Sequence, residues 1–316
     1  MKKIVVIGGG NGSSVLLKGL KNYDVGLTSI TNVTDSGGNT GKIKYDMNVL
    51  PVGDARRCLA ALSGNEKLAE LFEYRFEEGE LAGYVVGNVF LAAAAKATGS
   101  LSSSIREAEK FLNAKGRVVP ATLDWAELCA EFKDGRVIEK EHNISMQKGR
   151  IKRVFLKPEA GANPEALESI KNADLIIIAM GNLYASVLPN LLVRGMAEAI
   201  RKSGAKKLYV CNLLTTGNTE NYTVSDHLRL LQDKVGKIDY LIVNSSMPEK
   251  EAGILKEKKQ VPVQDDSEII KETKVLKGAL LKDGIAETKK SDTVTNRSLL
   301  IHDPEKLAKM VMETIK

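Results

Sequence analysis

Cysteines and aromatic side chains are scarce in this 316-residue sequence, and no apolar run approaches bilayer length. Cys58, Cys129 and Cys211 lie far apart without metal-ligand spacing, so we expect small core residues in a reducing compartment. The apolar run of four residues after Lys2 and Lys3 is too short for a signal peptide. These absences predict a cytoplasmic protein without membrane insertion.

The charge balance does not indicate a nucleic-acid partner. The formal net charge of +6 comes from 46 basic and 40 acidic residues, and many lysines fall within 250–290. Aromatic residues make up only 5% of the chain, whereas proteins that bind single strands need aromatic stacking platforms. The lysine-rich segment is therefore expected to be a solvated surface. The length fits two domains or one large α/β domain with an insertion.

The first stretch of the chain predicts a phosphate site. A β-branched apolar run breaks into Gly8-Gly9-Gly10-Asn11-Gly12-Ser13 and then resumes with helical spacing, which indicates strand, tight turn and helix. Glycines let the backbone approach an anion, and the first N–H groups of the helix supply positive potential. The dinucleotide fingerprint requires glycine where Ser13 stands, so the motif favours phosphate over NAD. A tight turn without a ligand is the alternative.

A second glycine-rich loop, 34–42, follows a predicted strand over 25–33. Both loops would lie at the carboxyl edge of a parallel sheet, where ligands of such folds bind. Asp35 is the first charged candidate there. It has three candidate functions, which are to hold Mg²⁺, to accept hydrogen bonds from a ribose, or to act as a base. Capping its own turn is an equally weighted alternative.

Two further segments contain polar candidates. Asp54 is predicted to cap the helix that follows it. Of the adjacent Arg56 and Arg57, one can face solvent while the other clamps a phosphate, and we select Arg56 for the clamp. Asn88 lies within an apolar helix expected over 85–97, where a buried amide needs partners from a neighbouring turn or a ligand.

The remaining pattern predicts one Rossmann-like α/β domain over residues 1–316, with a doubly wound, mainly parallel sheet. A helical insertion is expected over about 54–116 and a small antiparallel β-hairpin element over about 118–158, with a turn at 133–136. Buried strands are then expected over 173–179, 207–212 and 240–245, with polar turns after the first two. A short strand around 279–281 and a final helix from Pro304, capped by Asp303, complete the prediction.

Taken in order, these motifs resemble the CofD-like superfamily, and within it the sequence is most similar to the YvcK branch, the gluconeogenesis factors. The resemblance runs from Met1 to about Asn244 and rests on the segments 8–12, 35–41, 51–56, 74–76, 87–88, 181–190 and 211–212. It implies a Rossmann-like fold. YvcK-branch proteins bind UDP-N-acetylglucosamine and influence cell shape and carbon metabolism. CofD enzymes instead transfer a phospholactyl group from a guanosine diphosphate carrier to a deazaflavin, with Mg²⁺, in coenzyme F420 biosynthesis.

The resemblance also implies which residues form the site. Asp35 would be the magnesium ligand, or the catalytic residue if the chain is an enzyme. Three departures from the family pattern are Ser36 in place of a second aspartate, Tyr84 in place of histidine, and Ile301 in place of the arginine before a His-Asp pair. The implied nucleotide and phosphate ligands are Gly8, Gly9, Gly10, Asn11, Gly12, Ser13, Gly37, Gly38, Asn39, Arg56, Asn88, Gly181, Asn182, Tyr184, Ser186 and Asn212.

Three functions follow in order of preference. The first is a cytoplasmic regulator that binds a nucleotide diphosphate or nucleotide sugar such as UDP-N-acetylglucosamine, because the motifs lack a recognisable nucleophile or general base. The second is a Mg²⁺-dependent transferase of the 2-phospho-L-lactate type, since phosphoryl-type transfer needs mainly positioning and charge neutralisation. An NAD-dependent oxidoreductase comes last. The sequence leaves open whether a reaction is catalysed and whether the chain forms a homo-oligomer.

Overall fold

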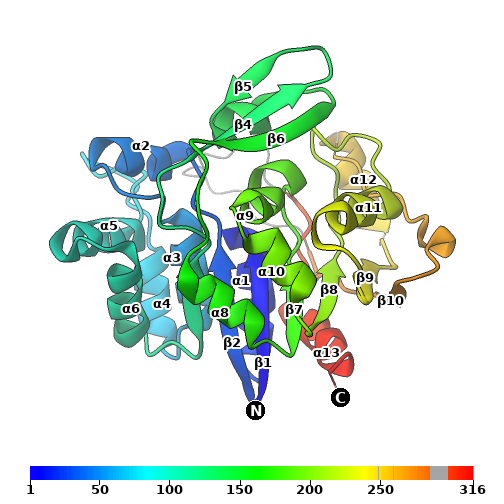
Figure 1. Cartoon of the computed structure of the whole chain (residues 1–316), viewed down its shortest axis with the longest axis horizontal. Helices are drawn as coiled ribbons and strands as arrows, with labels where there is room; N and C mark the ends of the chain where they lie inside the picture. Colours follow the sequence, from blue (N-terminus) through cyan, green and yellow to red (C-terminus); the bar gives the residue numbers. More distant parts are fainter. Residues whose placement is uncertain (248, 259, 285–297, 316) are drawn as a thin grey trace.

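Two sheets organise the chain in the computed structural model, which describes residues 1–247, 249–258, 260–284 and 298–315 (Figure 1). The main sheet is parallel throughout, in the order β10-β9-β8-β7-β1-β2-β3. The smaller sheet is antiparallel, in the order β5-β4-β6. The strands are β1 (Lys2–Gly8), β2 (Val25–Thr31), β3 (Arg117–Pro120), β4 (Glu127–Phe132), β5 (Val137–Glu139), β6 (Ile151–Lys157), β7 (Leu175–Ile178), β8 (Lys206–Val210), β9 (Tyr240–Asn244) and β10 (Lys274–Gly278).

Helices cover both faces of the main sheet, as predicted for a doubly wound fold. One face packs against α8 (Pro164–Lys171), the π-helical turn η1 (Leu183–Val187), α9 (Leu188–Leu192), α10 (Met196–Lys202) and α11 (Val224–Val235). The other packs against α1 (Gly10–Leu20), α3 (Gly53–Leu62), α4 (Glu66–Glu73), α5 (Val86–Thr98), α6 (Leu101–Phe111) and α13 (Pro304–Glu313). The remaining helices are α2 (Gly38–Asp46), α7 (Glu141–Met146), α12 (Glu249–Glu257) and the short η2 (Ser267–Ile269).

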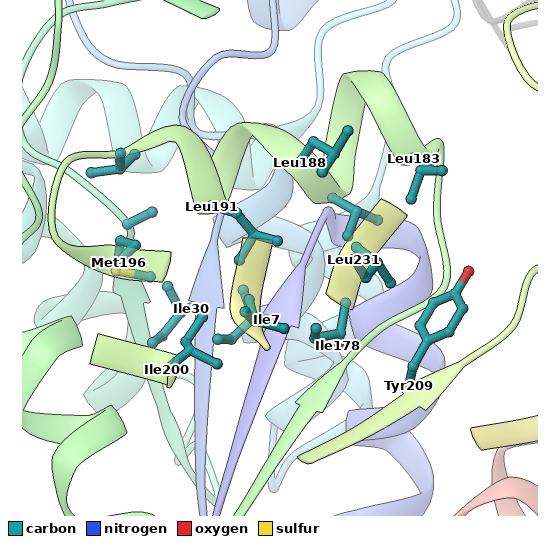
Figure 2. Packing of buried hydrophobic residues seen from close by; sticks show 14 of the residues in the cluster. Ile7, Ile30, Ile178, Leu183, Leu188, Leu191, Met196, Ile200, Tyr209 and Leu231 are labelled. Carbon is teal, nitrogen blue, oxygen red and sulfur yellow. The ribbon is translucent and has the colours of Figure 1, made fainter. Parts of the chain in front are cut away.

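Alternation along the strands divides the core between the two faces. In β1, Val5 and Ile7 pack on the side of α9 and α10, whereas Ile4 and Val6 pack on the side of α1. Figure 2 shows the first of these layers, in which Ile7 and its neighbours from β2 and β7 meet side chains of the covering helices. Because both sets are buried, the apolar residues of β1 (Ile4 to Ile7) and all of β7 form continuous apolar runs.

The strand order reverses between β1 and β7. From β1 the chain continues to β2 and β3 on one side, whereas β7 to β10 extend on the other. Ligands of open α/β sheets bind at such a reversal, outside the carboxyl ends of the strands. The small antiparallel sheet lies beyond these same carboxyl ends (Figure 1). The topology therefore sets the glycine-rich turn after β1 opposite the turn after β7.

The antiparallel element is smaller than predicted. β3 pairs in parallel with β2 and belongs to the main sheet, because the helical segment that ends with α6 returns the chain to that edge. The antiparallel part covers β4 to β6, and its predicted hairpin is confirmed, with Phe132 N donating to Arg136 O at 2.8 Å. Lys44 of α2 contacts this small sheet through an ion pair, in which its buried Nζ lies 2.7 Å from Glu127 Oε1 of β4.

Local predictions had mixed outcomes. Asp303 caps α13 as expected, since its Oδ1 accepts from the backbone N–H groups of Glu305 and Lys306 at 2.9 Å each. Asp54 does not cap α3, whose N-cap is Val52. The strand expected around 279–281 lies at 274–278. All three cysteines are buried and free.

Two further predictions concern the lysine-rich segment and membrane insertion. Within the lysine-rich stretch 250–290, residues 259 and 285–290 lie outside the described residues. Among the helices that the structure describes, none is long and apolar enough to cross a membrane.

Candidate functional site

Three helices begin next to one another at the carboxyl edge of the sheet. A Cβ atom built on Gly10, the first residue of α1, would lie 2.8 Å from Asp54 Cα in α3. A Cβ atom built on Gly53, the first residue of α3, would lie 3.2 Å from Asp35 Oδ2, just before α2. The first N–H groups of a helix lack intrahelical partners and carry positive potential. Their convergence makes this edge suited to an anion.

The turn after β7 closes against the glycine turn. A Cβ atom on Gly9 would lie 2.7 Å from Ser186 Cβ. Asn182 Oδ1 accepts from the backbone N–H groups of Tyr184 and Ala185, at 3.2 and 3.1 Å, and so caps η1. Both turns are thus held by packing and by side-chain hydrogen bonds.

Asn212, directly after β8, fixes the same turn from the other side. Its Oδ1 accepts from Gly181 N at 3.1 Å, and its Nδ2 donates to Gly181 O at 2.6 Å. Both ends of the amide are therefore used by the protein. Asn212 positions the turn through Gly181, and a cavity of about 180 Å³ begins beside it, bounded also by Asn244 and Asp265.

Carboxylates gather at the same place. Asp35 Oδ1 accepts from Gly37 N at 2.9 Å, so the self-capping turn is present. A Cβ atom on Gly37 would lie 3.4 Å from Asp35 Oδ1 and 3.9 Å from Glu141 Oε2. Asp54 lies beside the glycine turn, where its Oδ1 would be 2.8 Å from a Cβ atom on Gly10. Three acidic residues from distant segments therefore border the predicted phosphate position.

Burial and mutual repulsion favour protonation of two of these carboxyl groups. Burial first, and then the charge of Asp35, raise the pKa of Asp54 to about 6, although Arg57 and a hydrogen bond from the Gly10 backbone oppose the rise. Burial, then Asp35, and to a smaller extent Asp54, raise the pKa of Glu141 to about 8. Carboxyl groups with such raised pKa values are often found at functional sites.

The contribution of Asp54 to the stability of the ligand-free protein should consequently fall as pH rises. A carboxyl group whose folded-state pKa is raised stabilises the fold below its unfolded value, near 4, and this contribution is lost through the folded value. For Asp54 the raised pKa of about 6 corresponds to about 3 kcal/mol. We expect the free energy of unfolding of wild type in urea and EDTA to fall relative to that of Asp54→Asn between pH 4 and 7. The buried His302, whose lowered pKa makes stability rise with pH in this range, is common to both proteins and cancels in the difference. Glu165→Gln, the control, should run parallel to wild type; parallel profiles of wild type and Asp54→Asn would contradict the assignment.

The structure brings most of the predicted site residues to this edge. Gly8 ends β1, and the next residues form the turn and the start of α1, with Asn11 exposed and Ser13 buried. Within the described chain, Ser13 Oγ has no hydrogen-bond partner. Gly37 and Gly38 begin α2, followed by Asn39, whose Nδ2 would be 2.6 Å from a Cβ atom on Gly83.

Asn88 is buried near the start of α5. Among the described residues its Oδ1 also lacks a partner. No described turn therefore supplies the partner of this oxygen, and a ligand is the alternative that the prediction leaves.

Two predicted ligands are placed elsewhere. Arg56 Nη1 pairs with Glu73 Oε1 of α4 at 3.0 Å, so this end of the buried guanidinium joins two helices, while its Nε has no partner among the described residues. Tyr184 lies in the core, with its hydroxyl 2.8 Å from the hydroxyl of Tyr222. Successive helical residues point about 100° apart, which is why the neighbouring Arg57 takes the position beside the glycine turn.

Four residues at the site were not among the predicted ligands. Asp54 was interpreted only as a cap, and Arg57 as the arginine facing solvent. Glu141 and His142 come from α7, where His142 N donates to Ser36 Oγ at 3.0 Å. A Cβ atom on Gly37 would lie 3.5 Å from His142 Nδ1. No sequence pattern indicated α7, which lies between β5 and β6 of the predicted antiparallel element.

The donor set suits a hard cation shared with a ligand. Asp35 and Asp54 present carboxylate oxygens, which Mg²⁺ prefers, and their repulsion would be relieved by a positive charge between them. In the part of the chain that the structure describes, no group of three or more His, Cys, Asp or Glu side chains is arranged to hold a metal. A magnesium ion here would therefore take its other oxygens from phosphate and water.

The fold and this edge define a Rossmann-like α/β protein with a glycine turn at the strand-order reversal. More specifically, the chain belongs to the CofD family, whose description is 2-phospho-L-lactate transferase CofD, over residues 4–281. The predicted fold class and the predicted family are both confirmed.

Similar proteins match most or nearly all of the chain. A gluconeogenesis factor from Bacillus subtilis is 41% identical, over 99% of this chain and 98% of its own. One from Halalkalibacterium halodurans is 45% identical, over 77% of each chain. A crystal structure of a UPF0052 family member from Bacillus halodurans has a TM-score of 0.90 and 36% identity, over 99% of this chain and 100% of that one.

Proposed function

We propose that this chain binds the diphosphate of a nucleotide sugar such as UDP-N-acetylglucosamine and acts in the cytoplasm as a regulator of carbon metabolism or cell shape. The observation that carries this proposal is the meeting of three helix N-termini with the Ser186 turn at the strand-order reversal. Backbone N–H groups and glycines form an anion site there that does not depend on a lysine. The similar gluconeogenesis factors support the regulatory part of the proposal.

The chemistry of the cysteines and of one buried histidine supports binding without covalent catalysis. Burial raises the pKa of the thiols of Cys58 and Cys211 to about 12, so neither is a thiolate at neutral pH. Burial lowers the pKa of His302 to about 4, which makes it a poor proton acceptor. A ligand that is bound and not transformed needs neither group.

A Mg²⁺-dependent transferase of the 2-phospho-L-lactate type is the second candidate, favoured by the pairing of Asp35 with Asp54. An enzyme also needs room for a second, aromatic substrate. The cavity of about 180 Å³ beside Asn212 has room for a small group such as a base or a sugar, so a deazaflavin would need further space at this edge.

A thermal-shift panel tests the two functions against each other. It would contain UDP-N-acetylglucosamine, UDP, GDP, GTP, NAD and a deazaflavin, each with Mg²⁺ and with EDTA. A ligand at about a hundred times its dissociation constant stabilises the native state by about 2.7 kcal/mol, which the scan detects. We expect stabilisation by the UDP-sugar and by UDP.

The outcomes separate the candidates. Shifts with guanosine nucleotides and the deazaflavin that require Mg²⁺ would overturn the regulator in favour of the transferase. Stabilisation by NAD alone would reject both and would support an oxidoreductase. If no nucleotide shifts the unfolding temperature, the anion site itself is contradicted.

A further inference from the structure

We propose that Arg57 is the resident counter-ion of Asp54, that a divalent cation displaces it from this carboxylate, and that the released guanidinium then binds the ligand's phosphate. The proposal deepens the proposed function, on which its phosphate part rests. The displacement part concerns only this chain and a cation, so it can be tested alone.

The position of Arg57 carries the first step. Its Nη1 lies 3.3 Å from Asp54 Oδ1 one helical turn away, with side chains 24% and 11% exposed. Its Cδ would lie 3.1 Å from a Cβ atom on Gly10. The stem of the arginine therefore runs along the glycine turn, and its charged end lies at the edge where three helix N-termini meet.

The geometry of the pair carries the second step. A charge-assisted hydrogen bond between a guanidinium and a carboxylate is usually about 2.7–2.9 Å long and often bidentate. Arg57 and Asp54 share one hydrogen bond of 3.3 Å, and among the described residues it is the hydrogen bond that the Arg57 side chain forms. A single long bond leaves most of the five guanidinium N–H groups of Arg57 without a protein acceptor. Arg57 neutralises Asp54 without being fixed to it.

Competition between the cation and Arg57 for the Asp54 carboxylate would couple cation binding to nucleotide binding. A cation between Asp35 and Asp54 would compete with Arg57 for the Asp54 carboxylate, whose Oδ1 Arg57 now contacts. The released side chain needs only to rotate about its terminal bonds to face the glycine turn, where its planar fork matches phosphate oxygens. Cation and nucleotide would therefore favour each other's binding, with Arg57 changing from counter-ion to phosphate ligand.

Arg57→Met tests both steps, because it should change the affinity for the cation and the affinity for the nucleotide in opposite directions. Titrated with Mn²⁺ alone and followed by electron paramagnetic resonance, the variant should bind the cation several-fold more tightly than wild type, because the competing charge is gone. Calorimetry with UDP in Mg²⁺ should show affinity about tenfold lower or worse, since a charged hydrogen bond is lost. Arg57→Lys should keep cation affinity near wild type and bind UDP at an intermediate level.

A purely structural arginine would weaken both ligands, so weaker or unchanged Mn²⁺ binding in Arg57→Met overturns the proposal. Arg106→Met is the matched control, because this arginine forms an exposed pair with Glu165 at 2.9 Å and should alter neither affinity. If wild type fails to bind UDP while Arg57→Met binds Mn²⁺ more tightly, the counter-ion role stands and the phosphate role is rejected.

Discussion

Asp35→Asn should abolish the Mg²⁺ dependence of nucleotide binding and weaken the UDP-sugar about a hundredfold. Removing one member of a buried charged arrangement costs about 2–5 kcal/mol in binding, which spans this factor. Asparagine is the informative replacement because its Oδ1 can still accept the hydrogen bond from Gly37 N, now 2.9 Å long. The turn is preserved and only the charge is lost.

Calorimetry of UDP-N-acetylglucosamine binding at several Mg²⁺ concentrations measures this effect. Asp174→Asn provides a matched control, since Asp174 likewise accepts a backbone hydrogen bond, from Lys3 N at 2.8 Å, but next to the first residues of β1 and β7. An Asp35→Asn protein whose affinity still rises with Mg²⁺ would place the cation elsewhere.

Gly12→Ala should destabilise the fold by about 3 kcal/mol or more, the upper end of what an added methyl group costs in a packed interior. A Cβ atom at this position would overlap the carbonyl oxygen of Met180. That oxygen belongs to the backbone between β7 and η1, so it cannot rotate away as a side chain can. Helix propensity favours alanine over glycine by about 1 kcal/mol, which is too little to offset the overlap.

Urea unfolding of Gly12→Ala beside Gly204→Ala checks this expectation. A Cβ atom on Gly204 would meet no heavy atom within 4 Å among the described residues, so that variant should unfold like wild type. Equal stability of all three proteins would show that the two turns are not packed as closely as described.

The contacts of Gly10 and Gly12 give the glycine motif a second, structural reason that the sequence alone did not show. From sequence, the glycines indicated a backbone that an anion can approach. In the structure, Gly10 and Gly12 are also required because α3 and the Met180 carbonyl pack directly on them. Sequence periodicity was sufficient to predict strand, turn and helix, because those depend on neighbours in the chain. The second reason for the glycines depends on segments that are distant in sequence.

The same distinction explains the errors at the site. Asp54 stands where an N-cap would stand, yet its carboxylate lies beside the glycine turn because α1 and α3 begin together. No local pattern shows which of Arg56 and Arg57 faces that turn, since the partner of Arg56 is Glu73 in another helix. Glu141 reaches the site from beyond the hairpin, 106 residues after Asp35, and nothing near it in sequence indicates a ligand edge.

The two hydrogen bonds between Asn212 and Gly181 have a consequence for the rate of ligand binding. The turn after β7 is held in shape before any ligand arrives, so a phosphate entering there would order few groups and lose little conformational entropy. A preorganised site of this kind does not wait for a slow closing step, and its occupancy follows the free ligand closely in time.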